Sequence, residues 1–234
     1  MTIKTKWTWL AAAALPLLAA CGGSGGSDDD PVEMHTLRVT VTNLTANQPM
    51  SPVLVSLHRG GEAWQAGTPA SVALEQLAEG GDASALAAAL AASGGIVDAT
   101  GSAPVGPGGS DSFELSYPAA ADATLTLATM LVNTNDAFAG LGGLPVGALA
   151  VGASERFVLA AWDAGTEDNS EAAGTIPGPA DGGIGFDAAR DDALDAVRVH
   201  AGVVSHDDGL AGSTLGSKFR FDNPVLRVTV ERVQ

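Results

Sequence analysis

The feature of the sequence that most constrains the fold is the pentapeptide Leu-Arg-Val-Thr-Val, which occurs twice, at residues 37–41 and 226–230. In both copies apolar side chains alternate with polar ones, which is the two-residue period of a β-strand with one buried face. We therefore expect one strand at each end of the domain, both facing the same core, with direct pairing between them left open. The side chains expected in that core are Leu37, Val39, Val41, Leu226, Val228 and Val230.

Further short apolar runs between turn-forming residues predict more strands. They lie at residues 53–58, 112–117, 125–132, 156–162, 196–200 and 218–221. Thr68 followed by Pro69 predicts the start of a helix that Gly80-Gly81 ends, and a second short helix is predicted after Asp82. Residues 93–111, rich in Gly, Pro and Ser, are expected to form a loop. Many short strands with turns between them are typical of an all-β, antiparallel β-sandwich, here with one or two short helices.

Two of the predicted strands run into acidic, amide-rich loops. Residues 125–132 lead into Asn133-Thr134-Asn135-Asp136, and residues 156–162 lead into Asp163-Ala164-Gly165-Thr166-Glu167. Carboxylate, amide and hydroxyl oxygens on loops at the ends of rigid elements are typical ligands of hard cations such as Ca²⁺. The same residue types also form ordinary turns. The pattern makes Asp136 and Asp163 the candidate metal ligands, with supplementary side-chain oxygens from Thr134, Asn135 and Thr166.

Composition excludes several classes of function. The chain has 27 acidic and 11 basic residues, a formal net charge of -16. This balance argues against nucleic-acid binding, which needs a basic surface, and against unaided adhesion to an anionic membrane. The single cysteine excludes an intramolecular disulfide. The four histidines occur singly, without the H-x-x-x-H spacing of zinc sites.

The N-terminus has the pattern of a targeting segment. Lys4 and Lys6 precede an apolar run at residues 10–18, which is too short to span a bilayer, and the run ends in Leu18-Ala19-Ala20-Cys21. This stretch resembles a bacterial lipoprotein signal, whose terminal cysteine is acylated. The resemblance implies a signal peptide at residues 1–20, lipidation of Cys21 and a bacterial cell-envelope location, with Gly22 favouring the outer membrane. The alternative is an ordinary secretory signal with a free cysteine. Residues 21–33 are a Gly/Ser/Asp-rich tether, and residues 34–234 form the domain.

Several blocks together resemble the spondin N-terminal domain family, in particular bacterial lipoproteins that carry this domain alone. The matching blocks are residues 38–45 with 48–52, 70–71 with 77–81, 130–132 with 134–136 and 138, 163–167, and 223–225 with 227–230. The resemblance implies an antiparallel β-sandwich of about eight strands and one calcium ion held by loops at one end. It assigns Asp136 and Asp163 as ligands, with Glu114 as a third. Animal members function in adhesion within matrix proteins, but this chain lacks their repeat modules and disulfides.

Three functional hypotheses follow. The first is a non-enzymatic, calcium-binding module, anchored to the membrane by lipid and used for adhesion to, or interaction with, a protein or glycan ligand. The second is an envelope hydrolase that acts on polysaccharide through Asp136 and Asp163 as an acid–base pair. The low aromatic content, 5%, favours the first over the second. The third is a calcium-stabilised structural lipoprotein without a partner.

Overall fold

A computed structural model describes residues 31–190 and 194–234, and the predicted signal peptide, Cys21 and most of the predicted tether lie outside these residues. Residues Val32–Gln234 form one compact unit. It contains a four-stranded and a six-stranded antiparallel sheet, which confirms the predicted all-β class, together with two short helices. Neither helix among the described residues is long and apolar enough to cross a membrane.

The four-stranded sheet has the order β4-β1-β10-β7. Its strands are β4 (Ser110–Pro118), β1 (Met34–Asn43), β10 (Leu226–Arg232) and β7 (Ser154–Leu159). The two copies of the pentapeptide are the central pair, β1 and β10, in a register that sets Val39 opposite Val230 and Val41 opposite Val228. All six side chains predicted to be buried are at most 1% exposed. The expectation of a shared core is confirmed, and the pairing that the sequence left open is direct.

The six-stranded sheet has the order β3-β2-β5-β6-β8-β9. Its strands are β3 (Gly95–Thr100), β2 (Leu54–His58), β5 (Thr124–Met130), β6 (Ala137–Pro145), β8 (Ala161–Asp163) and β9 (Arg198–Val199). One hydrophobic cluster joins the inner faces of both sheets, so that Val39 and Val228 pack in the same core as Val55 and Leu127. The sheets therefore lie face to face, as in a β-sandwich.

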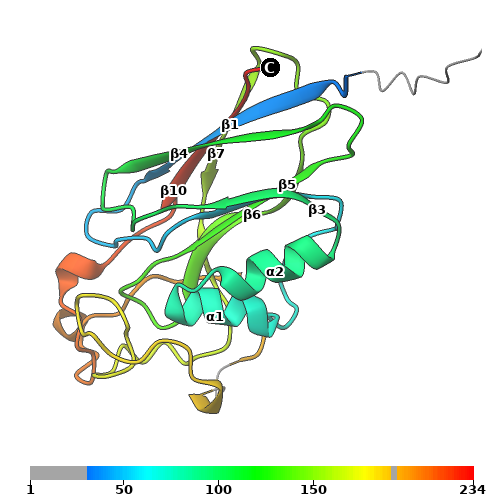
Figure 1. Ribbon diagram of the computed structural model, residues 1–234. Coiled ribbons are helices and arrows are strands. Elements are labelled where there is room, and N and C mark those ends of the chain that lie inside the picture. The colour runs from blue at the N-terminus through cyan, green and yellow to red at the C-terminus, as the bar shows by residue number, and fades with distance from the viewer. Residues whose placement is uncertain (1–30, 191–193) are drawn as a thin grey trace, which may run out of the picture. The chain divides into compact units, whose positions relative to one another are not determined.

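The helices α1 (Val72–Gly80) and α2 (Ser84–Ala92) cover the outer face of the six-stranded sheet, on the side away from β1 and β10 (Figure 1). They bury a second cluster in which Leu74, Leu77, Leu86 and Leu90 pack with Leu54 and Phe138. Gly81 ends α1 in the left-handed conformation, as predicted, with φ of 70°. The helix begins later than expected, because Ser71, rather than Thr68, accepts the capping hydrogen bond from the backbone N–H of Leu74.

Other boundaries differ from the prediction. The residues that the structure describes form ten strands rather than about eight, since the segment predicted as a loop contains β3 and the glycine-rich residues after Asp136 form β6. The strand predicted at 156–162 is two strands in different sheets, because the chain crosses between the layers near Ala160. The segment at 218–221 is not a strand. It overlaps the 3-10 helix η3 (Ser217–Phe219), which follows η1 (Ala188–Arg190) and η2 (His206–Asp208) in the long C-terminal loops.

Candidate metal centre

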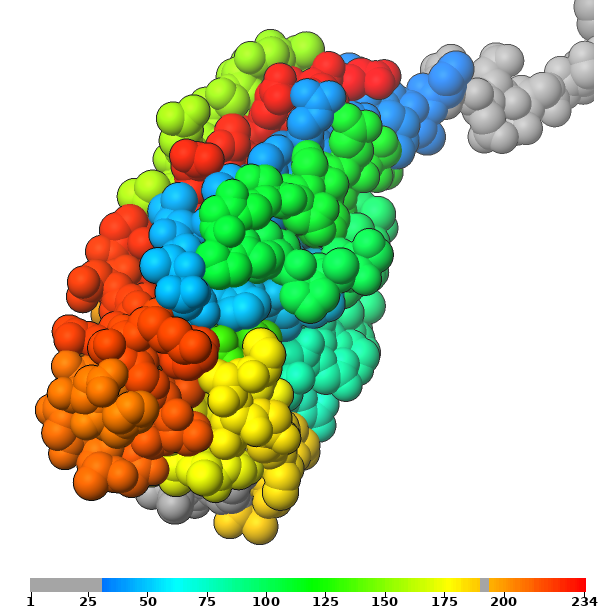
Figure 2. Space-filling view, turned by 90° about the vertical axis from the view of Figure 1, so that its left-hand side faces the viewer, coloured from blue at the N-terminus to red at the C-terminus, as the bar shows by residue number. Residues whose placement is uncertain are grey.

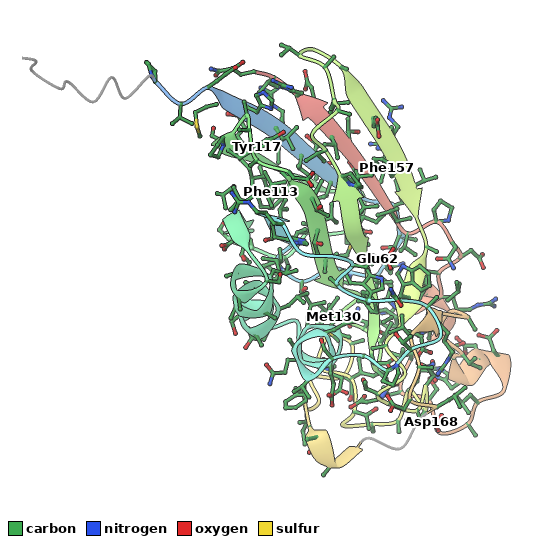
Figure 3. The ribbon with its side chains drawn as sticks, turned by 90° about the vertical axis from the view of Figure 1, so that its right-hand side faces the viewer. Glu62, Phe113, Tyr117, Met130, Phe157 and Asp168 are labelled. Carbon is green, nitrogen blue, oxygen red and sulfur yellow. The ribbon has the colours of Figure 1, made fainter. Side chains whose placement is uncertain are left out.

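The two acidic loops meet at one end of the six-stranded sheet. Asp136 directly precedes β6 and Asp163 ends β8, and these strands pair so that Ala137 lies opposite Asp163. The loop segments after β8 gather at this end (yellow to orange in Figure 2), and Figure 3 shows Asp168 among them, at the opposite end of the strands from Tyr117. Asp136, Asp163 and His200 each place one potential ligand atom within 4.8 Å of the others. The predicted convergence of the two loops is therefore present.

Asp136 is fully buried and only half satisfied. Its Oδ2 accepts hydrogen bonds from the backbone N–H groups of Thr166 (2.9 Å) and Glu167 (3.3 Å). Its Oδ1 has no hydrogen-bond partner among the described residues. Burial, and next the charge of Asp163, raise the pKa of Asp136 to about 7, although the backbone N–H groups oppose the shift. A proton or a cation at Oδ1 would remove the cost of burying this unpartnered oxygen.

Asp163, by contrast, has a donor on each of its oxygens, although Oδ1 accepts only one hydrogen bond. Its Oδ1 accepts from the backbone N–H of Gly165 (2.9 Å), and its Oδ2 accepts from Asn169 Nδ2 (2.7 Å) and from the Arg198 guanidinium (3.0 Å). The tight turn at Gly165 has φ of 78°, and a Cβ there would come within 2.5 Å of the Ala196 backbone oxygen. Only glycine fits this position without strain. Glycine at position 165 is thus required both by the turn and by the close approach of a neighbouring segment.

His200 was not predicted as a site residue. Its Nδ1 accepts a hydrogen bond from the backbone N–H of Gly202 (2.9 Å), so we assign the proton to Nε2, which donates to Asn169 Oδ1 (3.1 Å). Burial lowers the pKa of His200 to about 4, with Arg198 acting in the same direction and Asp163 against it. The ring is therefore neutral at pH 7. Both of its nitrogens are already engaged, so His200 orients Asn169 against Asp163 rather than offering a free lone pair to a metal.

A second set of polar groups surrounds this centre. Asn135 donates to Glu167 Oε2 (3.1 Å) and Thr175 Oγ1 (3.0 Å), and its Oδ1 accepts from the backbone N–H of Glu171 (3.1 Å). Thr134 uses its hydroxyl to hold the loop, donating to the Leu131 carbonyl oxygen (2.6 Å). These two supplementary ligands of the sequence hypothesis therefore act as loop scaffolding.

Two further side-chain oxygens in the same loops are buried without a hydrogen-bond partner among the described residues. They are Thr166 Oγ1 and Glu171 Oε2. Glu171 has the only positive φ of a non-glycine residue in the described chain, 45°, and burial raises its pKa to about 7. These two oxygens, like Asp136 Oδ1, are therefore available to a proton, a water molecule or a hard cation.

Glu114, the third ligand that the family resemblance assigned, lies elsewhere. It projects from the outer face of β4 in the other sheet, where its side chain is 60% exposed and forms an ion pair with Arg38 at 2.9 Å. The register of β1 and β4 places these two residues directly opposite each other. The structure therefore does not bring Glu114 to the pair formed by Asp136 and Asp163, and its alternation pattern is that of an ordinary solvent-facing residue.

Comparison with known proteins adds no assignment, since no family model and no curated protein matches this chain. The resemblance to the spondin N-terminal domain stays a prediction that rests on the sequence blocks described above.

Proposed function

We propose that the acidic loop end binds a divalent cation, calcium in the first place, through Asp136 and Asp163. The observation that carries the proposal is Asp136 Oδ1, a fully buried carboxylate oxygen without a hydrogen-bond partner among the described residues, beside a second buried carboxylate. Calcium takes six to eight oxygen ligands, so backbone carbonyl groups, water and Thr166 Oγ1 would complete the set. The residues present fit this ion, because their unsatisfied ligand atoms are oxygens.

The cation would hold the two loops together rather than take part in chemistry. Asp136 is 0% exposed and Asp163 is 2% exposed, so a polysaccharide chain cannot reach the pair unless the loops open. This burial favours a binding module over the hydrolase alternative, which needs both carboxylates in contact with substrate. Together with the lipoprotein-like N-terminus, it supports a non-enzymatic module, lipid-anchored in the bacterial envelope and used for adhesion or interaction.

Thermal melts of the full chain test the cation. The wild type, Asp136→Asn and Asp163→Asn are melted in chelator and then in millimolar calcium. At a hundredfold excess over the dissociation constant, the wild type should gain about 2.7 kcal/mol, and both variants should lose most of this gain. Asp136→Asn should be at least as stable as the wild type in chelator, since the change removes repulsion and a buried charge.

The proposal fails if calcium leaves the wild-type melting temperature unchanged, or if both variants respond to calcium as the wild type does. The anchor has a separate readout. Cys21→Ala should move the protein from the membrane fraction to the soluble fraction without changing the melt. Unchanged fractionation would remove the lipid anchor from the proposal and leave the cation site in place.

A further inference from the structure

A groove on the outer face of the six-stranded sheet contains both tryptophans of the described chain. The chain has four tryptophans, of which Trp7 and Trp9 lie outside the described residues. Trp64 and Trp162 line the same groove, together with Glu62, Gln65 and two glycines of β6, Gly142 and Gly143. Its volume of about 430 Å³ falls in the range of about 300–1,000 Å³ found for small-molecule sites. Both indole rings of the described chain therefore line one groove.

The indoles are held in fixed positions by strand geometry. Trp162 lies on β8 opposite Phe138 of β6, and Trp64 packs edge-on against Phe138 with ring centroids 5.1 Å apart. A Cβ at Gly142 would come within 3.1 Å of the Trp64 ring, so the absent side chain lets the indole lie against the strand. Both rings are only partly buried. The two rings are therefore fixed in position, and part of their surface is accessible to a ligand.

The segment that carries Trp64 is pinned at two points. The backbone N–H of Ala63 donates to the Gly142 carbonyl oxygen (2.7 Å), and that of Gly67 donates to the Val197 carbonyl oxygen (2.8 Å). Figure 3 shows Glu62 on this segment, where it crosses the strands of the sheet. A groove whose walls are fixed in advance loses little conformational entropy when a ligand binds.

Polar groups at the rim narrow the ligand class. Glu62 and Gln65 are exposed and place a carboxylate and an amide beside the indoles. A pyranose ring with equatorial hydroxyls has apolar C–H faces that stack on an aromatic ring, and its hydroxyl groups donate to carboxylate and amide oxygens. The carboxylate of Glu62 and the formal charge of -16 repel uronic acids and sulfated sugars. The exposed indole rings, the acceptor groups at the rim and the negative charge all favour a neutral sugar as the ligand.

We propose that this groove binds a neutral glycan of pyranose units, with Trp64 and Trp162 as stacking platforms and Glu62 and Gln65 as hydrogen-bonding groups. The proposal names a ligand for the interaction role argued above, and only in that respect does it rest on the proposed function. The groove lies on the outer face of the sheet and neither Asp136 nor Asp163 lines it, because both carboxylates are buried at the loop end. Glycan binding is therefore expected without the cation.

Intrinsic fluorescence tests the groove directly. In the full chain with Trp7→Phe and Trp9→Phe, Trp64 and Trp162 are the only indoles, so a sugar that stacks on them must change the emission. The probes are cellohexaose, chitohexaose and maltohexaose as neutral glycans, and heparin as the anionic one. We expect saturable emission changes with at least one neutral hexasaccharide and none with heparin. The absence of a response to all three neutral probes at millimolar concentration overturns the proposal, as does binding of heparin alone.

Three variants locate the binding. Trp162→Phe and Gln65→Ala should each lower the affinity for the responding glycan by about tenfold or more. The matched control is Val158→Ala, which changes an exposed apolar residue on β7 and should bind the glycan as the parent does. Melts confirm that each variant is folded. Parent-like affinity in both groove variants overturns the assignment. Titrations run in chelator and in calcium separate the two sites, because a protein that binds glycan but shows no calcium-induced melting shift loses only the cation proposal.

Discussion

Polar side chains cluster on the outer face of the four-stranded sheet and at the loop end of the six-stranded sheet. The two clusters differ in how their hydrogen-bonding groups are satisfied. On the first, hydroxyls pair across β1 and β4 at the surface: Thr36 with Ser116, Thr40 with Ser112 and Thr42 with Ser110. At the second, carboxylates are buried, and Asp136 keeps an oxygen without a partner in the described chain. A regular ladder satisfies its groups locally, whereas the loop end depends on groups from distant segments, which is where a ligand can contribute to stability.

The largest effect is expected where the regular region is broken. Deleting residues 224–234 removes β10, which lies between β1 and β7, and takes Val228 and Val230 out of the core. The truncation should cost more than the free energy of unfolding of a typical domain, which is about 5–15 kcal/mol. The truncated chain should therefore show no cooperative melt. Circular dichroism with temperature measures this. A sharp transition in the truncated chain would show that the central pair is not essential.

The second prediction concerns the unpartnered carboxyl of Asp136 in chelator. Its folded pKa of about 7 lies above its ordinary value of 3.8, so the folded state holds the proton more tightly and stability falls as pH rises between these values. The fall attributable to this group is about 4 kcal/mol, at 1.36 kcal/mol for each unit. Asp136→Asn should remove it, so the stability of the wild type relative to the variant should decline from pH 4 to pH 7.

Glu171 and His200 titrate in both proteins, so the difference between wild type and variant cancels their contributions. The folded pKa of Glu171 is raised to about 7, which also lowers stability as pH rises. That of His200 is lowered to about 4, which instead raises stability from pH 4 to its ordinary value of 6.5. Denaturant melts at five pH values give the comparison, and a constant difference would contradict the assignment. Calcium must displace the Asp136 proton, so its melting shift should be larger at pH 8 than at pH 5.

The third prediction uses a pair of glycines with left-handed backbones. Gly165 has φ of 78° and backbone atoms of Ala196 where a Cβ would lie, whereas Gly209 has φ of 102° and nothing within 4 Å. Gly209→Ala should cost about 1 kcal/mol for the conformation alone. Gly165→Ala should cost at least twice as much, and it should also weaken the calcium response, because the Asp163 turn shifts. Equal losses in urea melts would mean that the loop end accommodates the methyl group.

The same contrast explains what could be predicted from the sequence. The strands β1, β4 and β10 were predictable because a two-residue period is visible in the chain itself. The strand β6 was missed because Gly140, Gly142 and Gly143 lower strand propensity, and only its position between β5 and β8 stabilises it. The meeting of Asp136 with Asp163 was predictable, since each follows an apolar strand.

The rest of the centre carries no local signal. His200 reaches the acidic pair because β9 pairs with β8, across a loop of more than thirty residues, and it is a lone histidine in the sequence. Arg198 forms its ion pair with the Asp163 carboxylate because the same pairing of β8 with β9 brings the two residues together. Glu114 shows the converse, since a residue assigned to the site by resemblance lies on the exposed face of β4 in the other sheet, as its alternation indicates. Contacts made by tertiary pairing of short strands are the part that sequence periodicity does not encode.

Glu114 therefore gives the smallest expected effect and the sharpest control. Its ion pair with Arg38 is solvent-exposed, with side chains 60% and 42% exposed, so water and salt screen most of the attraction. Arg38 also contacts Glu231 at 3.1 Å, which leaves it a carboxylate partner after Glu114→Gln. The variant should melt within replicate error of the wild type and keep the full calcium shift, while Asp136→Asn loses it. A Glu114→Gln protein with a reduced calcium shift would place the cation on the outer face of β4 and contradict the loop-end site.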